Sequence, residues 1–330
     1  MTTLQRRHCI VAIGALFTAS NGGAQTASSR PTRIGILVGG SVAQRGHLEQ
    51  AMLAGLIEQG LVEGKNLVIE RRYADGRGEL VPEYARELAA LKLDAVVSTC
   101  TPSTLAAKSA TSSTPIVMAA VADPVGQQLI ASLARPGGNL TGLSSQAEDI
   151  LPKMLELFGA VLPRQAKVAV LTEAKSQVHP RMWLQLQPLA EALMLRVVRV
   201  DVASPADLTP AFERALRAAA QAAFVLPDEP MFLSRRSALV ELAAKHRLPA
   251  FYGAREFVDD GGLMSYGESL RGAYRNVGVY IGQLARGAKA AELPVQQPTR
   301  FELVINLKTA EALGISFPQA LRLRADAVLS

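Results

Sequence analysis

Short polar side chains follow several apolar runs of this sequence, in positions where they could bind a small charged molecule. Ser41 follows RIGILVGG, Asp123 follows PIVMAAVA, and the run DAVVST ends in Ser98 and Thr99, with Thr101 two residues later. Hydroxyl groups and the N–H groups of a helix N-terminus suit a carboxylate, and an acidic side chain suits an ammonium group. The alternative is that these residues only cap helices, and Thr101 is expected to cap the helix after it.

A second set of candidate residues lies in the later part of the chain. Glu173 follows KVAVLT, Asp228 follows AAFVLP, and Tyr252 and Tyr266 end two further apolar runs. The acids could hold an ammonium group, whereas the tyrosine rings could form walls around a ligand or pack at the edge of the core. Together the two sets predict a site for a small polar ligand, and they favour an amino acid.

The apolar runs read as strands that alternate with amphipathic helices. Strands are predicted over residues 33–38, 66–70, 94–98, 115–119, 167–171, 196–201 and 222–226. Leu48, Met52 and Leu56, spaced by four, indicate a helix after the first strand. Near-continuous apolar strands separated by helices predict an α/β fold with two parallel-sheet units, and ligands bind at the carboxyl ends of such strands.

The last third of the chain does not read as a third unit of this kind. Three short strands at 248–252, 262–266 and 301–306 are separated by a helix near 268–286 and a proline-rich segment at 293–298. We expect these strands to complete the two sheets. That arrangement requires the chain to cross between the units more than once.

Residue types and spacing argue against several other classes of protein. The net charge of +6 comes from scattered basic residues, so no nucleic-acid-binding face is expected. The sequence has no glycine-rich phosphate or dinucleotide loop, and His47, His179 and His246 are too far apart to pair as metal ligands. We therefore expect no cofactor, no metal and no catalytic residues, and we expect Cys100 to be a buried thiol.

The first 24 residues read as a signal peptide and not as part of the fold. Arg6 and Arg7 precede an apolar stretch at 9–19 that is too short to cross a bilayer. Small residues at 22–24 offer a cleavage site after Ala24. We therefore expect export and a mature protein in the periplasm.

Three longer stretches resemble one family of exported proteins. They are ADPVGQQLIASLARPGGNLTGLS at 122–144, LPAFYGAREFVDDGGLMSYG at 248–267 and LPVQQPTRFELVINLKTAEALGISFPQALRLRADAVL at 293–329. In these stretches the chain resembles the substrate-binding proteins of ABC transporters, of the type that includes candidates for tryptophan and tyrosine uptake. The resemblance implies a type I periplasmic binding protein fold, with two Rossmann-like lobes, three crossovers and a ligand cleft between the lobes.

The resemblance also implies boundaries, partners and a mechanism. The first lobe would comprise residues 31–141 and 253–292, and the second lobe residues 142–252 and 293–330. The crossovers would lie near 139–143, 249–253 and 293–298. A small-molecule ligand would be captured by hinge closure and delivered to an ABC permease in the inner membrane, by a protein that is a monomer and not an enzyme. The alternatives are a periplasmic sensor module that feeds a signalling partner, or a two-lobed hydrolase.

Overall fold

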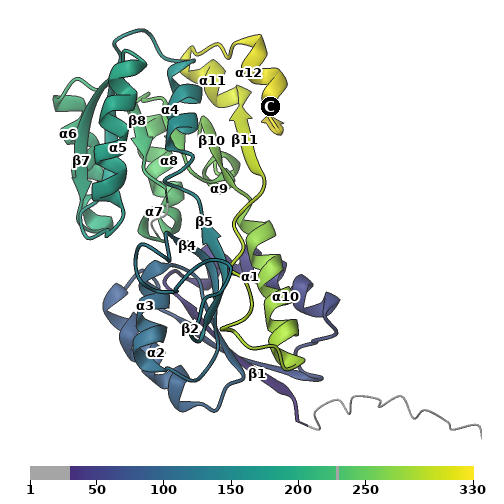
Figure 1. Ribbon diagram of the computed structural model, residues 1–330. Helices are drawn as coiled ribbons and strands as arrows, with labels where there is room; N and C mark the ends of the chain where they lie inside the picture. Colours follow the sequence, from purple (N-terminus) through teal and green to yellow (C-terminus); the bar gives the residue numbers. More distant parts are fainter. Residues whose placement is uncertain (1–29, 228–229) are drawn as a thin grey trace, which may run out of the picture. The chain divides into compact units, whose positions relative to one another are not determined.

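The computed structural model describes residues 30–227 and 230–330, and these residues form two sheets with their covering helices (Figure 1). The expected signal peptide lies outside the described residues, and so does Asp228. Within the described part, no helix combines the length and the apolar character needed to cross a bilayer.

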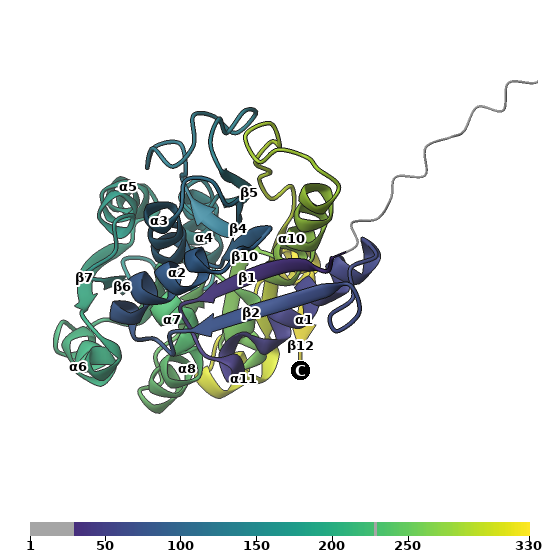
Figure 2. The same cartoon turned by 90° about the horizontal axis from the view of Figure 1, so that it is seen from below.

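The first sheet is parallel throughout, with the strand order β2-β1-β3-β4-β5. Its strands are β1 (Thr32–Val38), β2 (Leu67–Tyr73), β3 (Ala95–Ser98), β4 (Ile116–Ala122) and β5 (Leu140–Ser145). The helices packed with it are α1 (Val42–Glu58), η1 (Gly78–Leu80), α2 (Val81–Ala90), α3 (Thr101–Ala110) and α10 (Leu270–Ala285). We call this sheet and its helices the first lobe, and Figure 2 shows its strands β1 and β2 side by side.

The second sheet has the strand order β12-β11-β10-β9-β8-β6-β7, and within it β10 and β11 are antiparallel. Its strands are β6 (Lys167–Glu173), β7 (Arg196–Val202), β8 (Ala222–Val225), β9 (Ala250–Tyr252), β10 (Met264–Glu268), β11 (Phe301–Asn306) and β12 (Ala327–Leu329). Its helices are α4 (Leu151–Gly159), α5 (His179–Ala192), η2 (Pro205–Asp207), α6 (Leu208–Arg217), α7 (Pro230–Ser234), α8 (Arg236–Lys245), α9 (Arg255–Asp259), α11 (Leu307–Leu313) and α12 (Gln319–Arg324). Together they form the second lobe.

Both faces of each sheet are buried, which explains why the strands are apolar almost without interruption. In β1, Ile34, Ile36 and Val38 pack in the cluster that contains α1 and α10, whereas Leu37 packs in the cluster that contains α2. The second sheet likewise lies between two separate apolar clusters. The predicted α/β fold with two lobes built on parallel strands is confirmed.

The chain passes between the two sheets three times, as the resemblance implies. It leaves the first sheet after β5, returns to the first lobe from β10 to α10, and crosses again between α10 and β11. On the last passage the backbone of Gln296 accepts a hydrogen bond from the Ser144 N–H and donates one to the Gly142 carbonyl, both at 2.9 Å. The segment before β11 is thus attached to the edge of the first sheet.

Sheet membership differs from the boundaries expected from the sequence. The first sheet extends through β5 to Ser145, and β10 belongs to the second sheet although residues 253–292 were expected in the first lobe. Strand β10 pairs with β9 on one side and with β11 on the other, and Met264 is fully buried with Phe251. The three late strands therefore complete one sheet, and the second crossing falls after β10.

Helices α1 and α10 cross at two glycines. A Cβ atom on Gly55 would lie 2.0 Å from the carbonyl oxygen of Arg275, and one on Gly278 would lie 2.4 Å from the backbone of Gly55 and Leu56. Glycine is required because any side chain would separate the two backbones. By contrast, a Cβ atom on Gly46 of α1 would meet nothing within 4 Å.

We predict that Gly55→Ala lowers the free energy of unfolding by about 1–3 kcal/mol, because the added methyl group has no room at the crossing. Gly46→Ala, on the same helix, should raise the free energy of unfolding by about 0.5–1 kcal/mol, because alanine favours a helix and its methyl group meets open space. Urea unfolding followed by circular dichroism measures both changes. Equal effects of the two substitutions would contradict this account of the crossing.

Candidate functional site

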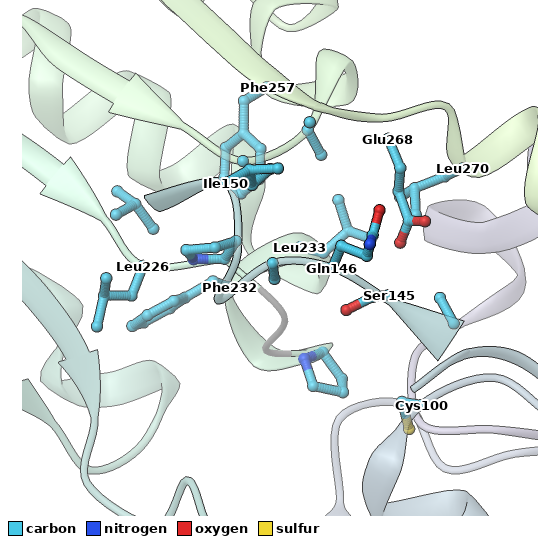
Figure 3. A pocket seen from close by; sticks show the side chains of 18 of the residues that line it. Cys100, Ser145, Gln146, Ile150, Leu226, Phe232, Leu233, Phe257, Glu268 and Leu270 are labelled. Atoms are coloured by element: carbon cyan, nitrogen blue, oxygen red, sulfur yellow. The ribbon is translucent and has the colours of Figure 1, made fainter. Parts of the chain in front are cut away.

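One cavity is lined by residues of both lobes (Figure 3). The first lobe contributes parts of α1, the β3–α3 turn, β4, the end of β5 and α10, and the second lobe contributes parts of β8, α7, α9, β10 and β11. The cavity holds about 810 Å³ of empty space, its open mouth included. It lies at the carboxyl ends of several parallel strands, where α/β sheets bind their ligands.

Apolar side chains form one side of the cavity. Phe232 and Leu233 of α7, Leu226 after β8, Phe257 of α9 and Ile150 before α4 all line it. Figure 3 shows Ile150, Leu226, Phe232 and Phe257 on the side away from Glu268. This wall suits an apolar or aromatic group of a ligand, because burial there removes both surfaces from water.

Polar side chains gather on another side of the same cavity. Figure 3 shows Ser145, Gln146 and Glu268 on the side away from Leu226. Ser145 ends β5 and Glu268 ends β10, so these two groups come from different lobes. A ligand that reached this region would contact polar groups of both lobes at once.

Three lining side chains carry buried polar atoms that have no hydrogen-bond partner in the described structure. These atoms are Nε of Arg45, Oγ of Ser145 and the hydroxyl oxygen of Tyr274. Burial raises the pKa of Tyr274, and the adjacent Arg45 and Thr99 side chains oppose this rise. Because buried polar groups normally have partners, such a cluster in one cavity indicates a place for a polar ligand.

The β3–α3 turn satisfies most of its own polar groups. The Ser98 and Thr104 hydroxyl oxygens are 2.6 Å apart, which leaves them hydrogen-bonded to each other. The backbone N–H groups of Thr99 and Cys100 both donate to Ser103 Oγ at 3.0 Å. The N–H groups that the sequence suggested for a carboxylate therefore already have an acceptor.

The structure separates the three candidate residues of this turn. Thr99 lines the cavity, and its hydroxyl donates to the Leu37 carbonyl at 3.2 Å. The expected capping role of Thr101 is wrong, because Thr101 is the first residue of α3 and Cys100 is the N-cap. Ligand binding by Ser98, Thr99 and Thr101 stays a prediction.

Asp123 takes part in a contact between the lobes. Its Oδ1 accepts from the Gly126 N–H at 2.8 Å, and its Oδ2 accepts from Nη1 of Arg181 in α5 at 2.9 Å. Arg181 also donates to Glu148 at 2.9 Å, and burial raises the pKa of Glu148 despite this cation. The Asp123 carboxylate is thus bound by the protein itself, and its role toward a ligand stays a prediction.

In the second lobe, Glu173 ends β6 beside the fully buried side chain of His179. The Glu173 N–H donates to Nδ1 of His179 at 2.8 Å, so Nε2 carries the ring proton and donates to the Pro227 carbonyl at 3.0 Å. Burial lowers the pKa of His179 to about 4, which keeps the ring neutral. His179 therefore connects the ends of β6 and β8 behind Pro227, which lines the cavity. Ligand binding by Glu173 stays a prediction.

The two candidate tyrosines lie behind the cavity wall. Tyr252 is 1% exposed, and its ring stacks on Phe257 with the ring centroids 4.5 Å apart. The Tyr266 ring lies 5.9 Å from that of Phe301. Phe257 and Phe301 both line the cavity. The tyrosines therefore support the wall through these phenylalanines, and direct contact with a ligand stays a prediction.

Sequence reasoning missed Arg45, although the sequence holds a signal for it. Arg45 precedes Leu48 by three residues and Met52 by seven, so it lies on the buried face of α1. A charged residue within such an apolar stripe needs an explanation. The candidate Ser41 lies just before this helix, half-exposed, and its carbonyl accepts from the Arg45 N–H at 3.0 Å; its role toward a ligand stays a prediction.

Two α/β lobes, three crossings and a cavity lined from both sides define a solute-binding protein with the type I periplasmic binding protein fold. The chain belongs to the ABC transporter substrate-binding protein family, whose model matches residues 34–329. The resemblance seen in the sequence is thereby confirmed. Proteins of this family capture a ligand for an ABC transporter.

Several known proteins are similar to this chain over most of its length. The tyrosine-binding protein of Clostridioides difficile (strain R20291) is 27% identical over 305 residues, which cover 90% of this chain and 85% of that protein. A conserved domain protein of Vibrio cholerae has a TM-score of 0.84 at 27% identity, covering 91% of this chain and 100% of its own. An ABC domain from Streptococcus pneumonia in complex with L-Trp has a TM-score of 0.80 at 27% identity, covering 90% and 100%.

We predict that His179 makes the fold sensitive to acid. The unfolded chain binds a proton on this residue with a pKa near 6.5 and the folded chain with a pKa of about 4, so stability falls as the pH drops through this interval. The free energy of unfolding falls by about 3 kcal/mol once the pH is below the pKa of the folded chain.

His179→Gln should be less stable than wild type at pH 7, but its free energy of unfolding should change less between pH 6.5 and pH 4.5. Urea unfolding at several pH values measures this. The same slope in His179→Gln and in wild type would show that His179 is not the responsible group.

Proposed function

We propose that this protein is the exported receptor of an ABC uptake system and that it captures a free amino acid with an apolar, aromatic side chain. The observation that carries the proposal is the cavity between the lobes, which has an apolar wall on one side and Glu268 among polar groups on another. The tyrosine-binding and L-Trp-bound relatives support this class of ligand.

The two sides of the cavity match the two parts of such a ligand. An aromatic side chain would lie against Phe232, Leu226 and Phe257, and burial of about 150–250 Å² of ring surface contributes about 4–6 kcal/mol before the costs of binding. The Glu268 carboxylate would accept hydrogen bonds from the ammonium group. A sugar carries no ammonium group for Glu268 to bind.

Binding would stabilise the arrangement in which the lobes are together. Arg181 pairs with Asp123 across the lobes at 2.9 Å, and Nε2 of His47 in α1 lies 3.4 Å from Oε1 of Glu256 in α9. Opening would separate these pairs and expose the cavity. A ligand that contacts both lobes favours the closed arrangement by its differential affinity, and that arrangement would dock on the permease.

The remaining parts of the proposal concern location and assembly. Residues 1–24 would direct export and be removed after Ala24, which would leave the mature receptor in the periplasm as a monomer. The chain would act by binding and release, with its permease as the partner that moves the amino acid across the inner membrane.

Isothermal titration with L-tryptophan, L-tyrosine, L-alanine and D-ribose tests the ligand class. We predict binding of an aromatic amino acid and no binding of the sugar. Glu268→Gln should weaken that binding by about 10- to 100-fold, because a charged hydrogen bond to the ammonium group is lost.

Glu302→Gln is the matched control for this substitution. Glu302 lies on β11 opposite Gly267, next to Glu268 in the ladder but outside the cavity lining. The Glu302→Gln variant should bind the aromatic amino acid with the affinity of wild type. Tight binding of D-ribose, or equal affinity of Glu268→Gln and wild type for the aromatic amino acid, would contradict the proposal.

A further inference from the structure

A positively charged side chain is buried in the cavity wall. Arg45 is 5% exposed, lines the cavity from α1, and its Nε has no hydrogen-bond partner in the described structure. Among residues 30–227 and 230–330, no carboxylate forms a salt bridge with it. A buried cation without an anion is costly, so an anion that reached Arg45 would be stabilised by pairing with it.

Two hydroxyl groups with unmet hydrogen-bonding capacity lie in the same cavity wall. Tyr274 of α10 is 4% exposed and Ser145 at the end of β5 is 6% exposed, and neither hydroxyl has a partner in the described structure. Tyr274 lies close enough to Arg45 for that cation to lower the pKa of its phenol against the effect of burial. The three groups come from three different elements of the first lobe, and each of them can donate a hydrogen bond. A hydrogen-bond acceptor that carries a negative charge would suit all three.

The rest of the cavity limits which anion fits. Glu268 also lines the cavity, and its negative charge disfavours a phosphate or another dianion. The β3–α3 turn does not compete for the anion, because Ser103 already accepts its N–H groups. A planar carboxylate with a single charge matches the guanidinium of Arg45 and leaves one oxygen for the hydroxyl groups.

We propose that Arg45, together with Tyr274 and Ser145, binds the carboxylate of the ligand. The inference rests on the proposed amino-acid function and adds a requirement to it. With Glu268 on the ammonium group and Arg45 on the carboxylate, the site would bind the free zwitterion more tightly than amines, amides and peptide-linked residues. Because residues 30–227 and 230–330 place no carboxylate on the Arg45 cation, Arg45 would serve binding at the expense of the stability of the ligand-free protein.

The experiment compares wild type with Arg45→Met, which keeps an unbranched apolar stem and removes the charged guanidinium group. Three probes are titrated calorimetrically: L-tryptophan, indole-3-propionate without the ammonium group, and tryptamine without the carboxylate. Thermal unfolding of both proteins is recorded without ligand. Arg86→Met, an exposed arginine on α2, is the matched control.

We expect Arg45→Met to lose about 10- to 100-fold in affinity for L-tryptophan and indole-3-propionate, and to bind tryptamine as wild type does. Its melting temperature without ligand should equal or exceed that of wild type. Arg86→Met should match wild type in every measurement. These results would support the carboxylate site.

Other results separate the two proposals. Undiminished binding of L-tryptophan by Arg45→Met, or an equal loss for all three probes with a lower melting temperature, would overturn the role of Arg45 and leave the amino-acid receptor standing. Wild-type binding of indole-3-propionate but not of L-tryptophan would reject the amino acid and keep the carboxylate site. Binding of none of the probes by wild type would overturn both.

Discussion

The arrangement of the cavity depends on one buried charge, the guanidinium group of Arg45, which lies between the two lobes. Arg45 is buried in the wall of a cavity that both lobes line, and residues 30–227 and 230–330 supply no salt-bridge partner for it. The surrounding groups follow the same constraint, because Tyr274 and Ser145 present hydroxyl groups with no partner. Among the described residues, these three groups thus leave hydrogen-bonding capacity that a polar ligand would satisfy.

The polar groups at the strand ends divide into two kinds. Those in the β3–α3 turn are bonded to one another, as in the Ser98–Thr104 pair, and Asp123 is bound by Arg181. These groups hold the framework of the cavity in place. The groups proposed to contact a ligand lie on helix faces and at the ends of β5 and β10. Position at a strand end is thus necessary for a ligand contact but does not by itself produce one.

The sequence predicts the fold well because the fold depends on local patterns. Runs such as RIGILV and the spacing of Leu48 and Met52 determine strands and helices within a few residues. The sheet that β10 joins could not be predicted, since it depends on pairing with β9 and β11 far along the chain. Thr99 could be placed at the cavity because it follows a strand directly. The spacing of Arg45 from Leu48 and Met52 indicates its burial, but its place at the cavity also depends on α10, which packs against α1 from far along the chain.

The crossing at Gly55 and Gly278 has a consequence for the order of events in capture. Because the backbones of α1 and α10 touch there, Arg45 and Tyr274 are carried on two helices that cannot shift apart separately. The distance between Arg45 and Tyr274 is therefore preserved when the second lobe moves. An amino acid would therefore bind first to the first lobe through its carboxylate, and the second lobe would then close over its aromatic side chain.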